Sequence, residues 1–96
     1  MSKKDLVNSD FASANLARAN LSRTNLTDAN LRFSVMLGAD LRSATMQDAV
    51  MHNADLRFAD MTNANLSCVD LTGANLSGAI FPAGYGKLET TNKKGK

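Results

Sequence analysis

The chain has 96 residues, of which 44% are hydrophobic and 5% aromatic, and its formal net charge is +2. This length fits a single domain. The sequence has neither the run of about 20 apolar residues that a transmembrane helix needs nor the apolar stretch of a secretory leader. We therefore expect no membrane segment and a cytoplasmic location. The single cysteine, Cys68, excludes an intramolecular disulfide.

A short lead over residues 1–3 is followed by a repeat with a period of five over residues 4–83. The residue two positions before each large apolar residue is usually alanine, and the residue one position before it is usually Asp or Asn. Tandem repetition is therefore the dominant signal in this chain. The large apolar positions are Leu6, Phe11, Leu16, Leu21, Leu26, Leu31, Met36, Leu41, Met46, Met51, Leu56, Met61, Leu66, Leu71, Leu76 and Phe81.

A period of five fits neither regular secondary structure. A helix would spread these apolar side chains around its whole circumference, and a flat strand would send successive ones to opposite faces. The chain must therefore turn once in each repeat, as in a solenoid of short straight segments joined by corners. The large residue and the small residue two positions before it then both point inward.

Repeats such as Ala14–Arg18, Ala39–Ser43 and Ala74–Gly78 resemble those of the pentapeptide-repeat family. The resemblance covers about residues 4–83. It implies an all-β fold, a right-handed quadrilateral parallel β-helix with about four coils of four pentapeptides each. Residues that share a column would then be 20 positions apart.

The repeats should end at Pro82, because proline cannot donate a hydrogen bond to the ladder between coils. We expect residues 84–88 to form a short C-terminal cap through Tyr85 and Leu88. Residues 89–96 have little apolar surface to bury, which predicts a flexible basic tail.

Thr24 and Ser34 each carry a hydroxyl at an inward position where most repeats have alanine. A buried hydroxyl without a partner costs about 1 to 3 kcal/mol. We therefore expect both side chains to form hydrogen bonds with neighbouring backbone.

Four apolar residues occupy outward or corner positions where the repeat otherwise prefers polar or small residues, and clusters of this kind usually mark association. We interpret them as a partner-docking or dimer patch with a polar rim of arginines. The other interpretation is that each corner phenylalanine lies across its own rod. The patch is Phe33, Val35, Leu37 and Phe58, and the rim is Arg32, Arg42 and Arg57.

Nothing in the sequence predicts catalysis, a cofactor site or a metal site. The one histidine, His52, is expected between Arg32 and Thr72 in its column, which is neither a triad nor a metal site. Residues 4–83 have a net charge of 6 − 8 = −2, so nucleic-acid binding is not expected. The carboxylates that could form acidic columns are Asp28 with Asp48 and Asp40 with Asp60.

The leading hypothesis is a non-enzymatic scaffold that presents a β-helix face to an unknown protein partner or to its own copy. The family resemblance implies an alternative, a DNA-mimicking binder of type II topoisomerase that protects it from topoisomerase poisons. This chain departs from such proteins because its repeat region is nearly neutral. A third hypothesis is an enzyme, which the absence of a convergent polar site disfavours, and a fourth is end-to-end stacking through an uncapped first coil.

Overall fold

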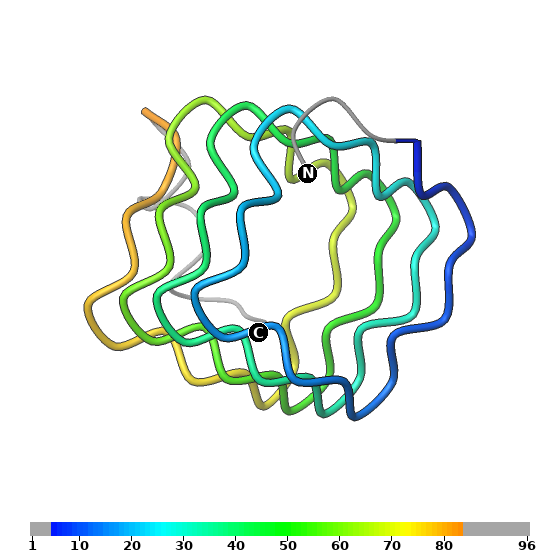
Figure 1. The fold of residues 1–96 in the computed structure, drawn as a ribbon. Coiled ribbons are helices and arrows are strands. Elements are labelled where there is room, and N and C mark those ends of the chain that lie inside the picture. Colours follow the sequence, from blue (N-terminus) through cyan, green and yellow to red (C-terminus); the bar gives the residue numbers. More distant parts are fainter. Residues whose placement is uncertain (1–4, 84–96) are drawn as a thin grey trace.

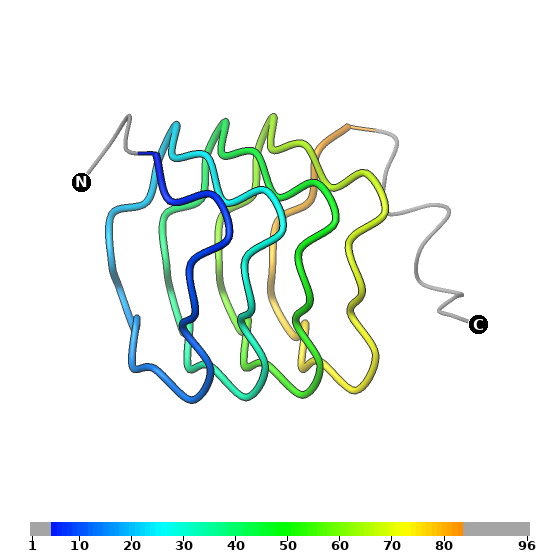
Figure 2. The same cartoon turned by 90° about the vertical axis from the view of Figure 1, so that its right-hand side faces the viewer.

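The computed structural model describes residues 5–83. In this range the chain winds into a square coil, which Figure 1 shows along its axis and Figure 2 from the side. The described residues contain no helix and no extended strand; each straight segment instead contributes one residue that forms isolated parallel bridges to the neighbouring coils.

Each bridge joins two residues that are 20 positions apart, from Asp5↔Asn25 to Asp60↔Ile80. Four pentapeptides therefore complete one turn of the coil, which confirms the predicted column spacing. The right-handed sense and the total of four coils stay predictions from the family resemblance.

The ladder between coils uses the backbone of every straight segment. The Leu31 N–H donates to the carbonyl of Val50 in the next coil at 2.7 Å, and the Asn30 N–H donates to the carbonyl of Ser9 in the preceding coil at 2.9 Å. The same two bonds recur with an offset of five residues along the chain. Adjacent coils are thus joined on all four sides.

Each corner is a tight turn with one residue in the left-handed region. In the turn after Leu31, the Ser34 N–H donates to the Leu31 carbonyl at 3.2 Å, and Phe33 has a φ of 59°. A positive φ at the third residue alone is the signature of a type II turn, which favours Gly or Asn at that position. Yet at twelve corners of the described chain the residue with the positive φ is not glycine.

The Asp or Asn before each large apolar residue has a local role in the turn. In twelve repeats its Oδ1 accepts the backbone N–H of the residue two positions later, as Asn65 does from Ser67 at 3.0 Å. This side chain supplies a hydrogen-bond acceptor for a backbone N–H that has no partner in the ladder between coils. Val35, Thr45 and Val50 replace Asp or Asn and form no such bond.

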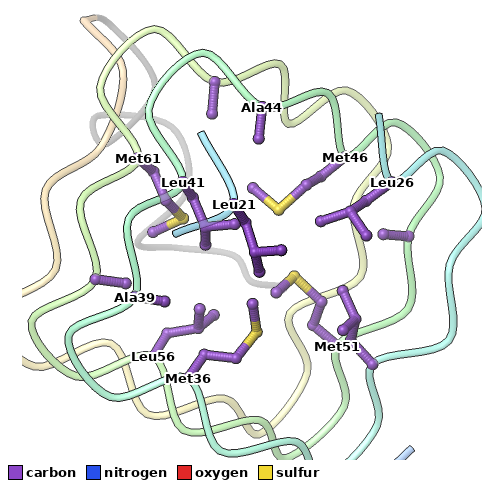
Figure 3. Packing of buried hydrophobic residues seen from close by; sticks show 14 of the residues in the cluster. Leu21, Leu26, Met36, Ala39, Leu41, Ala44, Met46, Met51, Leu56 and Met61 are labelled. Carbon is purple, nitrogen blue, oxygen red and sulfur yellow. The ribbon is translucent and has the colours of Figure 1, made fainter. Parts of the chain in front are cut away.

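The core is a stack of Leu, Met and Ala side chains inside the coil, as predicted from the period of five. Figure 3 shows these side chains pointing toward the axis, and every large one from Leu26 to Met61 is fully buried. The buried Ser34 Oγ donates to the Leu31 carbonyl at 2.8 Å, which confirms its predicted backbone bond. The buried Thr24 hydroxyl lies 3.5 Å from the Ser22 carbonyl.

The two ends of the described coil are less well covered. Their inward apolar residues are only partly buried, in contrast to those of the middle. The predicted lead over residues 1–3, the cap over 84–88 and the tail over 89–96 lie outside the described residues. Between residues 5 and 83, no helix has the length and apolar character needed to cross a membrane. The partly buried end residues include Leu6, Phe11, Leu16, Leu71, Leu76 and Phe81.

Candidate functional site

One side of the coil carries the predicted apolar patch, and we call it the Val35 side. Its outward residues are joined in one bridge column, Asn15↔Val35↔Asp55↔Asn75. Two columns of corners bound it, and each corner contributes two turn residues. The corner pairs are 12–13, 32–33, 52–53 and 72–73 on one edge, and 17–18, 37–38, 57–58 and 77–78 on the other.

Coils are numbered in steps of 20 residues from residue 5, so the second coil comprises residues 25–44. Phe33 and Val35 lie on the second coil of this side and are both exposed. The Phe33 side chain is 58% exposed at its corner, and Val35 is 38% exposed in the middle of the side. Leu37 lies at the opposite corner of the same coil but is half-buried, so it contributes less surface than its neighbours. Exposed apolar surface thus spans this coil from corner to corner.

Phe58 lies one coil further along, at the same edge as Leu37, and is 64% exposed. Its ring lies directly over Gly78: a Cβ added to this glycine would be 2.6 Å from the ring atom Cδ1. Phe58 therefore lies across its own rod, as the second interpretation expected, and still exposes most of its surface. The residue 20 positions after Phe33 is Asn53 rather than glycine.

Two of the predicted rim arginines, Arg32 and Arg57, lie on the edges of the Val35 side. Arg57 forms a bidentate pair with Asp55, with Nε–Oδ1 at 2.9 Å and Nη2–Oδ2 at 2.8 Å. Hydrogen bonding to Arg57 lowers the pKa of the Asp55 carboxyl. Arg32 donates from Nη1 to the amide oxygen of Asn30 at 3.3 Å.

The prediction that Arg42 belongs to this rim is wrong. Arg42 follows Leu41, so its turn lies at a corner that does not bound the Val35 side, and its guanidinium holds Asp40 through bonds of 2.8 and 2.7 Å. Arg18 takes the vacant place in the rim, because its Cγ lies 3.6 Å from the Cβ position of Gly38. Counting 20 residues back from Gly38 would have found Arg18 from the sequence.

The two predicted acidic columns differ in their surroundings. Asp40 and Asp60 are bridge partners, and the hydrogen bond from Arg42 lowers the pKa of the Asp40 carboxyl. Asp28 and Asp48 are exposed turn residues with φ of 62° and 61°. Neither of them forms an ion pair within residues 5–83.

Sequence reasoning missed a contact between His52 and Asp70. The His52 Nε2 lies 2.6 Å from Asp70 Oδ2, while the Thr72 hydroxyl donates to Asp70 Oδ1 at 2.7 Å. The hydrogen bond from Thr72, followed by that from His52, lowers the pKa of Asp70 to about 2. Because residue 50 is valine, no carboxylate or amide lies two positions before His52, and the ring contacts the next coil instead. No group of three His, Cys, Asp or Glu side chains in the described chain could hold a metal ion.

Known proteins with the same architecture carry the same repeat. A thylakoid-lumen pentapeptide repeat protein of Arabidopsis thaliana matches with 39% identity and a TM-score of 0.78. One from Nostoc PCC 7120 matches with 36% identity and a TM-score of 0.82, and one from the cyanobacterium Cyanothece 51142 with 33% and 0.65. The three matches cover 79%, 84% and 84% of this chain.

The same matches cover 52% of the Arabidopsis chain, 68% of the Nostoc chain and 59% of the Cyanothece chain, so this chain spans about half the length of the first. No curated protein sequence gives a significant match. The family model for pentapeptide repeats matches residues 5–42, 24–63 and 46–81 with eight copies. The chain therefore belongs to the pentapeptide repeat family.

Proposed function

We propose that the protein is a non-enzymatic scaffold that binds another protein through the Val35 side. The observation that carries this proposal is Phe33, a large aromatic residue that is 58% exposed and has a φ of 59°. An L-residue in the left-handed conformation costs about 1 to 2 kcal/mol. Twelve corners of the described chain share this conformation without glycine, so the exposed aromatic ring, and not the φ, distinguishes Phe33.

The architecture of the coil gives no reason for this phenylalanine. Asn8, Asn53 and Asn63 occupy the same turn position in other repeats, and Asn tolerates the left-handed region better than most residues. The ring of Phe33 is not part of the buried core either. Aromatic side chains are enriched at protein interfaces, because they bury a large area with few rotatable bonds. Binding is the role that suits such a residue.

The composition of the side as a whole also supports the proposal. Its apolar residues lie on the second and third coils, whereas the first and fourth coils contribute small or polar residues such as Asn15 and Asn75. An apolar centre with a polar rim is the common layout of a protein–protein interface. Arg57, held by Asp55, adds a fixed charged group beside Phe58.

The experiment is selection of a random peptide library on the immobilised 96-residue protein, followed by affinity measurements on variants. Peptides selected on the wild type should bind the double variant Phe33→Asn/Phe58→Asn at least about tenfold more weakly, as expected for loss of central aromatic anchors. Ser43→Asn is the matched control, because Ser43 has the same turn position and φ (59°) at a corner that does not bound this side. Selected peptides that bind the double variant as tightly as the wild type would contradict the proposal.

The DNA-mimicking alternative has less support. It needs carboxylates that stand in for rows of phosphates, and the Asp40 carboxylate is already held by Arg42. Asp28 and Asp48 then remain as one short column. A supercoiling assay with a type II topoisomerase and a poison tests it, and protection by the wild type but not by Asp28→Asn/Asp48→Asn would favour it over the scaffold.

A further inference from the structure

We propose that the segment bound by the Val35 side is acidic, with Asp or Glu side chains next to its apolar anchors. This inference rests on the proposed function and adds the chemistry of the partner. It comes from the charges around the patch rather than from the patch itself.

The charged residues of the Val35 side are mostly positive. Arg18, Arg32 and Arg57 lie at its edges, and Asp55 is its one carboxylate within the described residues. The count gives 3 − 1 = +2 for this side. His52 and Arg32 lie at the same edge, and both reach toward the neighbouring side: the His52 ring contacts Asp70, and Arg32 donates to Asn30 in the same bridge column as Asp70. A surface of this sign attracts acidic partners and repels basic ones.

The three arginines are not equally available to a partner. Both oxygens of Asp55 hold Arg57, so two of the N–H groups of that guanidinium are already used. Arg32 has only one long bond, 3.3 Å to an amide oxygen, and the Arg18 side chain has no hydrogen-bond partner within residues 5–83. Arg18 and Arg32 lie at opposite edges, where they flank the apolar surface of the second coil. Guanidinium groups with open donors bind carboxylates in a bidentate manner.

The same charges argue against a second copy as the occupant. A two-fold dimer would place this side against itself, so that two surfaces of +2 would meet. Juxtaposed like charges repel and disfavour such a contact, and Asp55 is already engaged by Arg57. An acidic segment meets no such repulsion and would provide acceptors for both open arginines.

The test uses the peptides selected on the wild type and measures their affinity for Arg18→Gln/Arg32→Gln. We expect selected sequences rich in Asp and Glu and a roughly five- to tenfold loss of affinity in the variant, which is the range for two solvent-exposed charge contacts. This difference should shrink between about 0.05 and 0.5 M salt, because salt screens exposed charges. Arg23→Gln is the matched control: Arg23 shares the turn position and φ of Arg18, 59° against 60°, but lies one corner away, off the Val35 side.

Each other outcome has a distinct meaning. Peptides that need Phe33 and Phe58 but tolerate Arg18→Gln/Arg32→Gln would overturn the acidic partner and leave the proposed function standing. Peptides indifferent to all four residues would overturn both. A dimer in light scattering that Phe33→Asn/Phe58→Asn dissociates would identify a second copy as the occupant and overturn the inference.

Discussion

Leu31 and Phe33 are two residues apart and both large and apolar, yet Leu31 is fully buried and Phe33 is 58% exposed. The inward position selects residues by volume, because a narrow coil must be filled without voids. The corner position selects residues by backbone conformation, because the type II turn requires a positive φ. Leu31 satisfies its rule, whereas Phe33 is one of nine described corner residues that are neither Gly nor Asn, and it differs from most of them in exposing an aromatic ring. The inward residues thus determine the stability of the coil, and the outward corner residues are free to take part in binding.

Substitutions at the inward positions should have the largest effect on the stability of the coil. Leu41→Ala or Leu56→Ala removes a side chain with 0% exposure and should lower the free energy of unfolding by about 2 to 5 kcal/mol, because it leaves a cavity in the core. Urea denaturation measures this change. Arg42→Ala, which truncates an exposed side chain at a turn, is the control and should have little effect. Equal losses in the inward and outward variants would show that the register is wrong.

The corner glycine under Phe58 should give the next largest effect. Gly78→Ala places a Cβ 2.6 Å from the Phe58 ring at a φ of 72° and should cost about 1 to 3 kcal/mol from combined strain and contact. Gly38→Ala is the matched control, because its Cβ meets Arg18 at an ordinary 3.6 Å and only the backbone is strained. Thermal unfolding of both variants compares them. If Gly78→Ala cost no more than Gly38→Ala, the ring would not be held against the rod.

The inward-pointing side chains were predictable from the sequence because they recur at a fixed period. A period of five, with small residues two positions before the large ones, fixed which side chains point inward, and the columns at 20 residues followed from the family resemblance. Arg18, Arg42 and the contact between His52 and Asp70 were missed or misplaced. The position of each arginine depends on the corner at which its repeat lies. The contact of His52 depends on Val50, which offers its side chain no hydrogen-bond partner. Both properties change from repeat to repeat, so the period does not predict them.

The smallest predicted effect concerns pH. The pKa of Asp70 is lowered from 3.8 to about 2, so its ionised form stabilises the fold above about pH 4, and this contribution is lost as the pH falls toward 2. Because the Asp70 side chain is 45% exposed, screening keeps the contribution within about 0.2 to 1 kcal/mol. Subtracting the unfolding free energies of Asp70→Asn from those of the wild type between pH 2 and 6 isolates it. A difference that does not change over this range would contradict the assigned contacts with Thr72 and His52.

The most direct test of the central claim is the free energy of unfolding of Phe33→Asn. If Phe33 is kept for binding at the expense of its backbone, Asn should relieve the strain at a φ of 59°, and the variant should be as stable as the wild type or more stable by up to about 1 kcal/mol. Urea denaturation of the two proteins side by side gives this number. A loss of more than about 1 kcal/mol would mean that the phenylalanine stabilises its own coil, and the Val35 side would lose its main argument as a binding surface.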